Sequence, residues 1–199
     1  QVASGLIAHG VKPGDSVGIM LPNIPQFVAC QFGTLMAGAV MVPLNVMLTG
    51  PEIEYIAGDS KLRVLITYEM FAPQVSAGIK DMEDPPQVFV IGANTDGHHG
   101  YPALLKDDPD FKPIEVDPAL PIQTLYTSGT TGKPKGAQIT GANIIANLDM
   151  MESIFPAEPD DKALCVLPLF HCFALNGVLN AAIRNRTAVL LHPRFDLEA

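Results

Sequence analysis

The chain has 199 residues, of which 48% are hydrophobic, and it carries a formal net charge of −9 at pH 7. This length and composition allow one folded domain with a substantial buried core. A pI near 4.8 argues against nucleic acid or an anionic membrane surface as a partner, although a local group of cations can still bind a small anion.

The first residues place apolar side chains at helical spacing, with neither an initiator methionine nor a signal-peptide pattern before them. These residues are Val2, Leu6 and Ile7. We therefore expect a helix here and interpret residues 1–199 as part of a larger domain, truncated at both ends.

The cysteines Cys30, Cys165 and Cys172 lie among apolar neighbours and lack Cys-x-x-Cys spacing. This pattern favours buried free thiols over a disulfide framework or a metal site. Free thiols persist in a reducing compartment, so we predict a cytoplasmic location.

No charged residue occurs from Ser16 to Pro51, which raises the question of a membrane span. Three prolines divide this segment: Pro22, Pro25 and Pro43. They leave a helix of about a dozen residues over 26–38, roughly 20 Å long at 1.5 Å per residue. A spanning helix needs about 20 residues. We therefore predict a buried strand, helix and strand rather than a membrane span.

Short apolar runs separated by turn residues continue this alternation. Thr49 and Glu52 form a capping box with Pro51 in the first turn, which predicts a helix over 50–58. A weaker helix is expected between the third and fourth strands. This order predicts an α/β fold with a largely parallel sheet and flanking helices. The first four expected strands cover residues 17–21, 40–44, 63–67 and 87–91.

Residues 93–121 lack apolar periodicity and predict a long surface connection. The pair His98-His99 lies in this segment without spaced partner ligands nearby. A solvated turn therefore explains the two histidines better than a metal site.

Residues 125–136 read Leu-Tyr-Thr-Ser-Gly-Thr-Thr-Gly-Lys-Pro-Lys-Gly. Glycines let backbone N–H groups approach an anion, and hydroxyls can donate hydrogen bonds. Lys133 and Lys135 are the only charged residues between Asp117 and Asp149. The segment therefore predicts a site for nucleotide phosphates, the alternative being a plain Gly/Ser/Thr turn between strands. It is not a Walker loop, because the glycine spacing is too short and Pro134 follows the first lysine.

A returning strand is expected at 136–140, followed by an amphipathic helix that includes Ile144, Leu148 and Met151. A further strand over 162–167 ends at Pro168. The next helix has one apolar face, formed by Leu175, Val178, Leu179 and Ala182. Arg184 and Arg186 suit the C-terminal end of that helix. Residues 168–174 thus follow the carboxyl end of a strand, where open α/β sheets place ligand groups. Taken alone, His171 is more often a packed histidine than a catalytic one.

Residues 126–136 resemble the phosphate-loop signature of the AMP-forming adenylating enzymes, a superfamily of acyl-CoA synthetases, luciferases and peptide-synthetase adenylation domains. Pro-Leu-Phe-His at 168–171 resembles its second signature, which lines the acyl pocket. Residues 10–19, 35–45 and 194–196 also match similar segments. Ala174 stands where glycine is common, and Gly141-Ala142 where histidine is common. Peptide-synthetase domains usually carry Phe-Asp in place of Leu-Phe-His, so the acyl-CoA synthetase branch is favoured. A luciferase-like enzyme, a peptide-synthetase domain and a non-catalytic nucleotide-binding module remain alternatives.

The resemblance implies the N-terminal subdomain of an adenylate-forming enzyme that uses ATP, Mg²⁺ and coenzyme A. A carboxylic acid, such as a fatty acid, would attack the α-phosphate of ATP, and the thiol of CoA would then displace AMP. The C-terminal domain would be absent from residues 1–199, so we expect the isolated chain to be inactive and to self-associate. The implied catalytic residues are Lys135 and His171; the implied phosphate-binding residues are Thr127, Ser128, Gly129, Thr130, Thr131, Gly132 and Lys135; Phe170 and His171 would bind the acid; and Thr127 is a candidate Mg²⁺ ligand.

Overall fold

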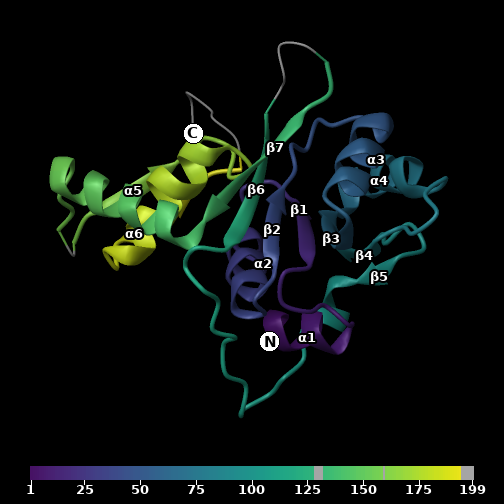
Figure 1. The fold of residues 1–199 in the computed structure, drawn as a ribbon, viewed down its shortest axis with the longest axis horizontal. Coiled ribbons are helices and arrows are strands. Elements are labelled where there is room, and N and C mark those ends of the chain that lie inside the picture. The colour runs from purple at the N-terminus through teal and green to yellow at the C-terminus, as the bar shows by residue number, and fades with distance from the viewer. Residues whose placement is uncertain (128–131, 159, 194–199) are drawn as a thin grey trace.

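A seven-stranded sheet forms the centre of the computed structural model, which describes residues 1–127, 132–158 and 160–193 (Figure 1). The strand order is β5-β4-β3-β1-β2-β6-β7. All neighbours are parallel except β7, which returns antiparallel to β6. The strands are β1 (Ser16–Met20), β2 (Val40–Pro43), β3 (Leu62–Tyr68), β4 (Gln87–Ile91), β5 (His99–Gly100), β6 (Pro121–Thr127) and β7 (Lys135–Thr140).

Helices cover both faces of this sheet and create two apolar cores. Alternate residues of one strand enter opposite cores, because side chains alternate across a strand: Ile19 packs with α2, whereas Met20 packs with α3 and α4. The uncharged segment of residues 16–51 therefore supplies two interior strands of the sheet, β1 and β2, and the helix α2 that packs against it. The helical segments of this part are α1 (Val2–Ala8), α2 (Pro25–Met36), α3 (Gly50–Asp59), η1 (Glu69–Phe71), α4 (Ala72–Ile79) and η2 (Tyr101–Leu104).

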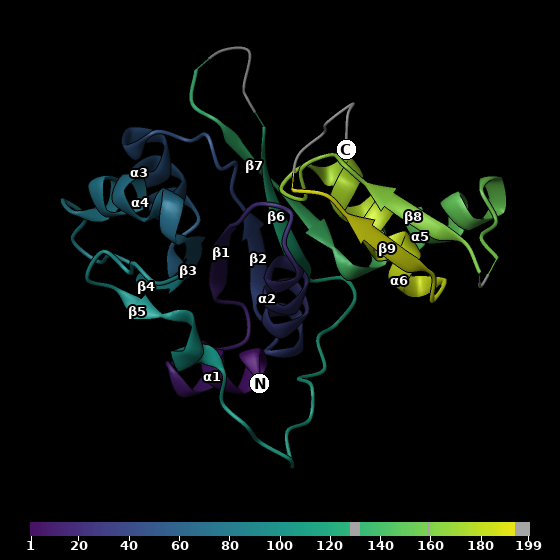
Figure 2. The same ribbon diagram turned by 180° about the vertical axis from the view of Figure 1, so that it is seen from behind.

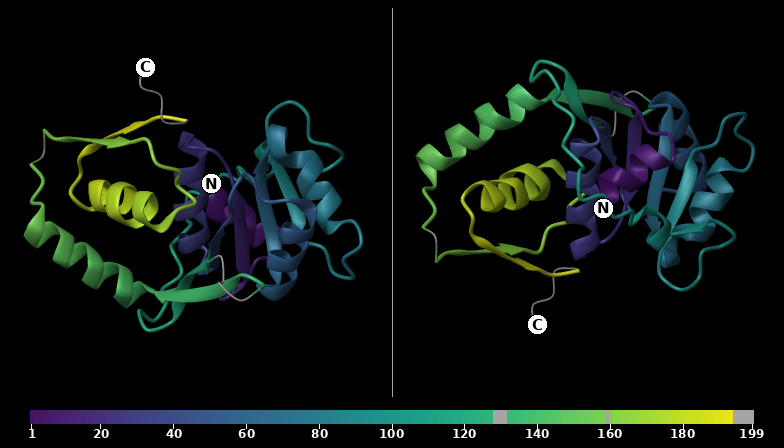
Figure 3. Two further views of the ribbon diagram at one scale, coloured as in Figure 1. Left: turned by 90° about the horizontal axis from the view of Figure 1, so that it is seen from above. Right: turned by 90° about the horizontal axis from the view of Figure 1, so that it is seen from below.

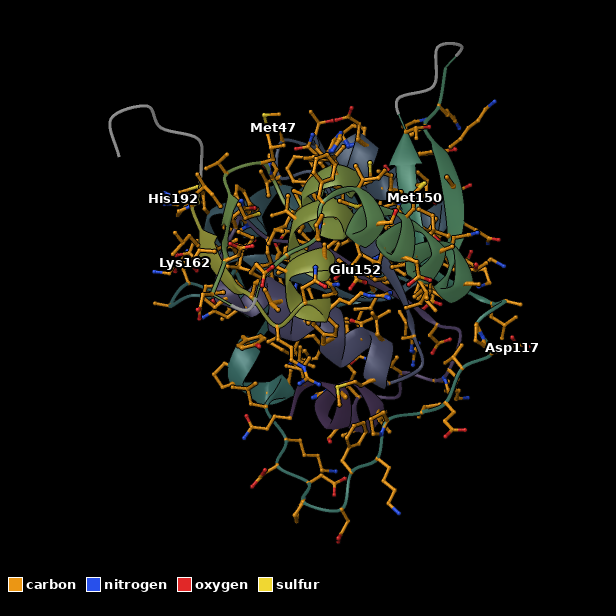
Figure 4. All side chains as sticks on the ribbon, turned by 90° about the vertical axis from the view of Figure 1, so that its left-hand side faces the viewer. Met47, Asp117, Met150, Glu152, Lys162 and His192 are labelled. Carbon is orange, nitrogen blue, oxygen red and sulfur yellow. The ribbon has the colours of Figure 1, made fainter. Side chains whose placement is uncertain are left out.

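The last part of the chain builds a second, smaller layer around a two-stranded parallel sheet, β8–β9 (Figure 2). Segments η3 and α6 lie between α5 on one side and β8–β9 on the other (Figure 3). The elements are α5 (Gly141–Ile154), β8 (Lys162–Cys165), η3 (Phe173–Asn180), α6 (Ala181–Arg184) and β9 (Ala188–Leu191). Figure 4 shows the side chains of this half, with Met150 and Glu152 on α5 and Lys162 on β8.

Most sequence-based expectations are confirmed. The strand predicted at 87–91 coincides with β4, and the predicted capping box begins α3, where Glu52 accepts the backbone N–H of Thr49 at 2.8 Å. The α/β class with a largely parallel sheet is confirmed. Among the described residues, no helix is long and apolar enough to cross a membrane.

Two expectations are wrong. Cys172 is exposed rather than buried, because it precedes η3 on the solvent side, whereas Cys30 and Cys165 are buried as predicted. The pair His98-His99 is not a simple solvated turn. His99 lies in β5 and stacks on Phe89 with ring centroids 5.2 Å apart, and His98 is hydrogen-bonded to Ser76 at 2.8 Å.

The helix predicted from the apolar face of residues 175–182 is confirmed, with Leu175, Leu179 and Ala182 buried, but its winding was not expected. Residues Phe173–Asn180 form a π-helix that continues into α6. Such helices are rare and occur frequently at functional sites. The second sheet, β8–β9, was not expected either.

Candidate functional site

The strands β6 and β7 form a hairpin that projects beyond the rest of the sheet (Figure 1). Thr127, the last residue of β6, is paired with Lys135, the first residue of β7. Directly opposed residues of an antiparallel pair present their side chains on the same face. The hairpin therefore brings together the first hydroxyl and the second lysine of the glycine-rich segment, and both residues are exposed.

Ser128, Gly129, Thr130 and Thr131, which we predicted to bind phosphate, lie outside the described residues. Gly132 is described and has a φ of +135° with open space where a Cβ would lie. The backbone conformation, rather than crowding, therefore favours glycine at this position.

Helix α3 supports the hairpin through aromatic and polar contacts. The Tyr55 hydroxyl donates to the carbonyl oxygen of Pro134 at 3.1 Å, and the Lys133 ammonium lies 5.1 Å from the centre of the Tyr55 ring. The Tyr126 hydroxyl donates to the carboxylate of Asp59 at 2.5 Å. These contacts attach β6 and the residues just before β7 to one helix.

Burial, together with the hydrogen bond to Asp59, raises the pKa of Tyr126 well above its usual value, so this phenol stays protonated. Across the hairpin, Tyr126 is paired with Gly136. A Cβ on Gly136 would lie 3.1 Å from Cζ of the Tyr126 ring and 2.9 Å from Cγ2 of Thr124. Close approach of these two side chains therefore favours glycine at position 136.

His171 lies in the turn between β8 and η3. Its backbone N–H donates to the carbonyl oxygen of Pro168 at 3.0 Å, and its own carbonyl accepts the N–H of Leu175 at 3.0 Å. The ring atom Nδ1 accepts the N–H of Phe173 at 3.3 Å. In the neutral imidazole this leaves Nε2 as the donor, on a side chain that is exposed. Phe170, the second predicted acyl-binding residue, is half-buried beside it.

A chain of buried side-chain amides connects η3 to the hairpin. Gln31 on α2 donates to Asn180 at 2.6 Å, and Asn180 donates to Asn176 at 2.8 Å. Asn176 and Gln123 on β6 then exchange two longer hydrogen bonds, at 3.4 and 3.5 Å. The segment after His171 is thereby linked to the strand that ends at Thr127.

These supporting residues escaped the sequence analysis. A signal for Gln31 was present, and the same signal marks Asn23 just before α2: both are polar side chains inside the uncharged segment of residues 16–51. Both are almost fully buried, with exposed fractions of 4% and 0%. A buried amide requires hydrogen-bond partners, so its presence in such a run predicts a specific contact.

No group of three or more His, Cys, Asp or Glu side chains suited to a metal ion occurs in the part of the chain that the structure describes. The candidate Mg²⁺ ligand Thr127 is an exposed hydroxyl beside Lys135. Mg²⁺ often keeps several waters and binds through substrate phosphates and few protein oxygens. A single hydroxyl at this position fits that mode of binding.

Comparisons with known proteins agree with this arrangement. The family model for AMP-binding enzymes matches residues 1–199. The chain is 34% identical over 201 residues to indoleacetate–CoA ligase from Aromatoleum aromaticum, covering 100% of this chain and 39% of that protein. It is 30% identical over 225 residues to a long-chain-fatty-acid–CoA ligase from Bacillus subtilis, covering 98% of this chain and 40% of the relative.

Solved structures show the same fold. A long-chain-fatty-acid–CoA ligase from Archaeoglobus fulgidus superposes with a TM-score of 0.89 at 26% identity, over 99% of this chain and 39% of that one. The N-terminal domain of FACL13 from Mycobacterium tuberculosis gives a TM-score of 0.83 at 29% identity, over 98% of this chain and 48% of that one. The chain thus spans less than half the length of these relatives. The family match over residues 1–199 and the shared fold show that this chain belongs to the AMP-binding enzyme family, with acyl-CoA ligases among its relatives.

Proposed function

We propose that the full-length protein containing this chain is an AMP-forming acyl-CoA synthetase that activates a carboxylic acid, such as a fatty acid, through an acyl-adenylate. The observation that carries the proposal is the pairing of Thr127 with Lys135 at the end of a hairpin whose sequence resembles the family's phosphate-loop signature. A hydroxyl and an ammonium group on one face can hold a phosphate by a charge-assisted hydrogen bond.

In this proposal Lys135 neutralises charge that builds up on the phosphates when the carboxylate attacks the α-phosphorus and pyrophosphate leaves. Thr127, Gly132 and residues 128–131 would supply hydroxyl and backbone N–H donors. Preorganised donors stabilise such charge without having to reorient during the reaction. The contacts with α3 support this role, because they hold the hairpin strands in one position.

His171 and Phe170 would form part of the wall that receives the acid. With Nδ1 occupied by the Phe173 N–H, His171 would present Nε2–H toward a carboxylate oxygen. The side chain of Phe170 would exclude water from the reacting carboxyl group.

Thr127 would also contribute an oxygen to Mg²⁺ bound with ATP. When present, the ion supplies positive charge that neutralises the phosphate oxygens. Coenzyme A would enter in the second half-reaction, in which its thiol sulfur forms the thioester bond and AMP leaves.

This chain would form part of the N-terminal domain, since 98% of it superposes on the N-terminal domain of FACL13 and it spans only 39% and 40% of two relatives that are CoA ligases. The groups that bind adenine and ribose, and a C-terminal domain with further catalytic groups, would come from the rest of the protein. Binding and orientation would therefore be incomplete in the isolated chain.

The test is pyrophosphate exchange into ATP by the full-length protein, with a panel of fatty and aryl carboxylic acids. Exchange that depends on the acid, followed by thioester formation when CoA is added, supports the proposal. ATP binding without exchange for every acid in the panel would indicate a nucleotide-binding module. Exchange without thioester formation would indicate an adenylating enzyme of another branch.

A further inference from the structure

The side chain of Asn23 joins two backbone groups that lie more than 140 residues further along the chain. Its Nδ2 donates to the carbonyl oxygen of Leu167 at 2.9 Å, and its Oδ1 accepts the N–H of Leu169 at 2.8 Å. Both bonds have ordinary hydrogen-bond length, and Asn23 is only 4% exposed. A carboxamide is suited to this position because it carries one donor group and one acceptor.

The two groups flank Pro168, which has no N–H of its own. In an extended chain, the carbonyl of one residue and the N–H of the second residue after it face the same side. This pair is what a neighbouring parallel strand would engage with its backbone. Asn23 therefore makes, with its side chain, the two hydrogen bonds that the backbone of a neighbouring strand would make. It does so at residues 167–169, after β8 has ended at Cys165.

The clamped segment leads directly to His171. The carbonyl of Pro168, between the two groups that Asn23 holds, accepts the N–H of His171 at 3.0 Å. Leu169 is fully buried in the apolar core, so packing of its side chain also holds this segment. At the far end of η3, Gln31 donates to Asn180 at 2.6 Å. Asn23, just before α2, and Gln31, within α2, thus hold the two ends of residues 167–180.

Asn23 also connects this segment to the sheet that carries the hairpin. It lies three residues after the end of β1, and β1, β2 and β6 are parallel neighbours. The carboxyl ends of parallel strands meet at one edge of a sheet, where ligands bind in open α/β folds. Asn23, which follows β1, and Thr127, which ends β6, therefore lie at the same edge of the sheet.

We propose that Asn23 is a positioning residue, which sets the place of His171 relative to the phosphate hairpin by holding Leu167 and Leu169. This inference rests on the proposed function, because the two parts that it aligns are the acyl-binding wall and the phosphate site. A misplacement of about 1 Å at reacting groups can reduce the rate of reaction on the order of a hundredfold.

The test uses Asn23→Asp in the full-length protein. The carboxylate keeps the shape of the side chain and still accepts the Leu169 N–H, but it cannot donate to the Leu167 carbonyl. We expect kcat for acid-dependent pyrophosphate exchange to fall about ten- to a hundredfold, while KM for ATP stays within about twofold. A protonated carboxyl has a donor and an acceptor, so the ratio of variant to wild-type kcat should rise as the pH is lowered from 8 to 6.

Thr34→Val is the matched control. Thr34 is fully buried in α2, and its hydroxyl donates within that helix to the Cys30 carbonyl at 2.8 Å. Thr34→Val should lower thermal stability. Its kcat should stay close to that of the wild type, and the ratio of the two kcat values should not change with pH. Equal kinetic losses in both variants at equal loss of stability would overturn the proposal, as would a kcat for Asn23→Asp within about threefold of wild type.

Hydrogen exchange separates this inference from the proposed function. In Asn23→Asp, peptides covering residues 165–173 should exchange about tenfold faster or more, and those covering β3 and β4 should not change. Unchanged exchange at 165–173 overturns the clamp whether or not the protein activates an acid. Absence of acid-dependent pyrophosphate exchange into ATP by the wild-type protein would instead refute the proposed function.

Discussion

The ammonium nitrogen of Lys133 lies 5.1 Å from the centre of the Tyr55 ring, which directs this lysine toward α3. The next residue, Pro134, is held by the Tyr55 hydroxyl at 3.1 Å. Lys135 instead begins β7 opposite Thr127. Residues two apart in an extended chain point to the same side, but these contacts give the two lysines different surroundings.

Lys135→Ala should therefore damage ATP turnover in the full-length protein more than Lys133→Ala. Loss of a charge-assisted hydrogen bond to the reacting phosphates should cost about 1.5–3 kcal/mol, roughly ten- to a hundredfold in rate. Loss of an exposed cation–π contact should cost about 0.5–1 kcal/mol, which would lower the rate by no more than roughly two- to fivefold. Steady-state kinetics of both variants decides the matter. Equal losses, or a larger loss at Lys133, would place the phosphate contact on the other lysine.

Tyr126 should titrate at an unusually high pH. Burial and the hydrogen bond to Asp59 raise its pKa above the usual value of about 10. Folding therefore favours the protonated phenol. The resulting stabilisation is fully present below about pH 10 and is lost as the pH rises through the raised pKa of the folded protein.

Phenolate absorbance measures this shift. The difference between the titrations of wild type and Tyr126→Phe should have its midpoint above pH 10, with Tyr68→Phe as the control for removal of a tyrosine at a strand end. A Tyr126 difference curve with its midpoint at or below pH 10 would contradict the hydrogen bond to Asp59.

One of the three thiols should react much faster than the other two with a disulfide reagent at pH 8. Burial raises the pKa of Cys30 to about 12 and also raises the pKa of Cys165, so both remain unreactive thiols. Cys172 is exposed beside His171. Cys172→Ser should abolish the fast reaction, whereas Cys30→Ser should leave it intact. A second fast thiol in the folded wild-type protein would show that a core cysteine is accessible.

The isolated chain, residues 1–199, should not activate carboxylic acids. It spans 39% of its indoleacetate–CoA ligase relative, and in our proposal the adenine-binding and C-terminal groups come from the rest of the full-length protein. Positioning and charge stabilisation would both be incomplete. Pyrophosphate exchange is again the measurement, with the full-length protein as the positive control. Acid-dependent exchange above background by the pure chain would refute this expectation.

The isolated chain should also self-associate. Two apolar grooves flank the pair Phe32 and Ile183, one toward β9 and the other toward α5. Ile183 is 39% exposed, and contiguous apolar surface of this kind promotes association. Ile183→Lys should shift the population toward monomer in light scattering. Met70→Lys, at a position that is 73% exposed on η1, should not. A wild-type chain that stays monomeric at high concentration would contradict the prediction.

Much of the fold follows from local chemistry that is visible in the sequence. Pro22, Pro25 and Pro43 divide the uncharged segment because proline restricts its own φ and the residue before it. The capping box at Thr49 and Glu52 begins α3 because it satisfies backbone donors within one turn. The glycine-rich segment and the Pro-Leu-Phe-His run identified the family, because both are contiguous signatures.

Tertiary structure alone decided the rest, since the deciding interactions join residues far apart in the chain. Whether Cys172 is exposed depends on how η3 packs between α5 and β8–β9. The apolar spacing of residues 175–182 predicts a helix but does not reveal its π-helical winding. The ring that contacts Lys133 but not Lys135 belongs to Tyr55 on α3, 78 residues before Lys133. The amide that positions the segment leading to His171 belongs to Asn23, 148 residues before His171. A hydrogen bond or a ring contact of this kind has no local pattern, because its partner is chosen by the packing of whole elements.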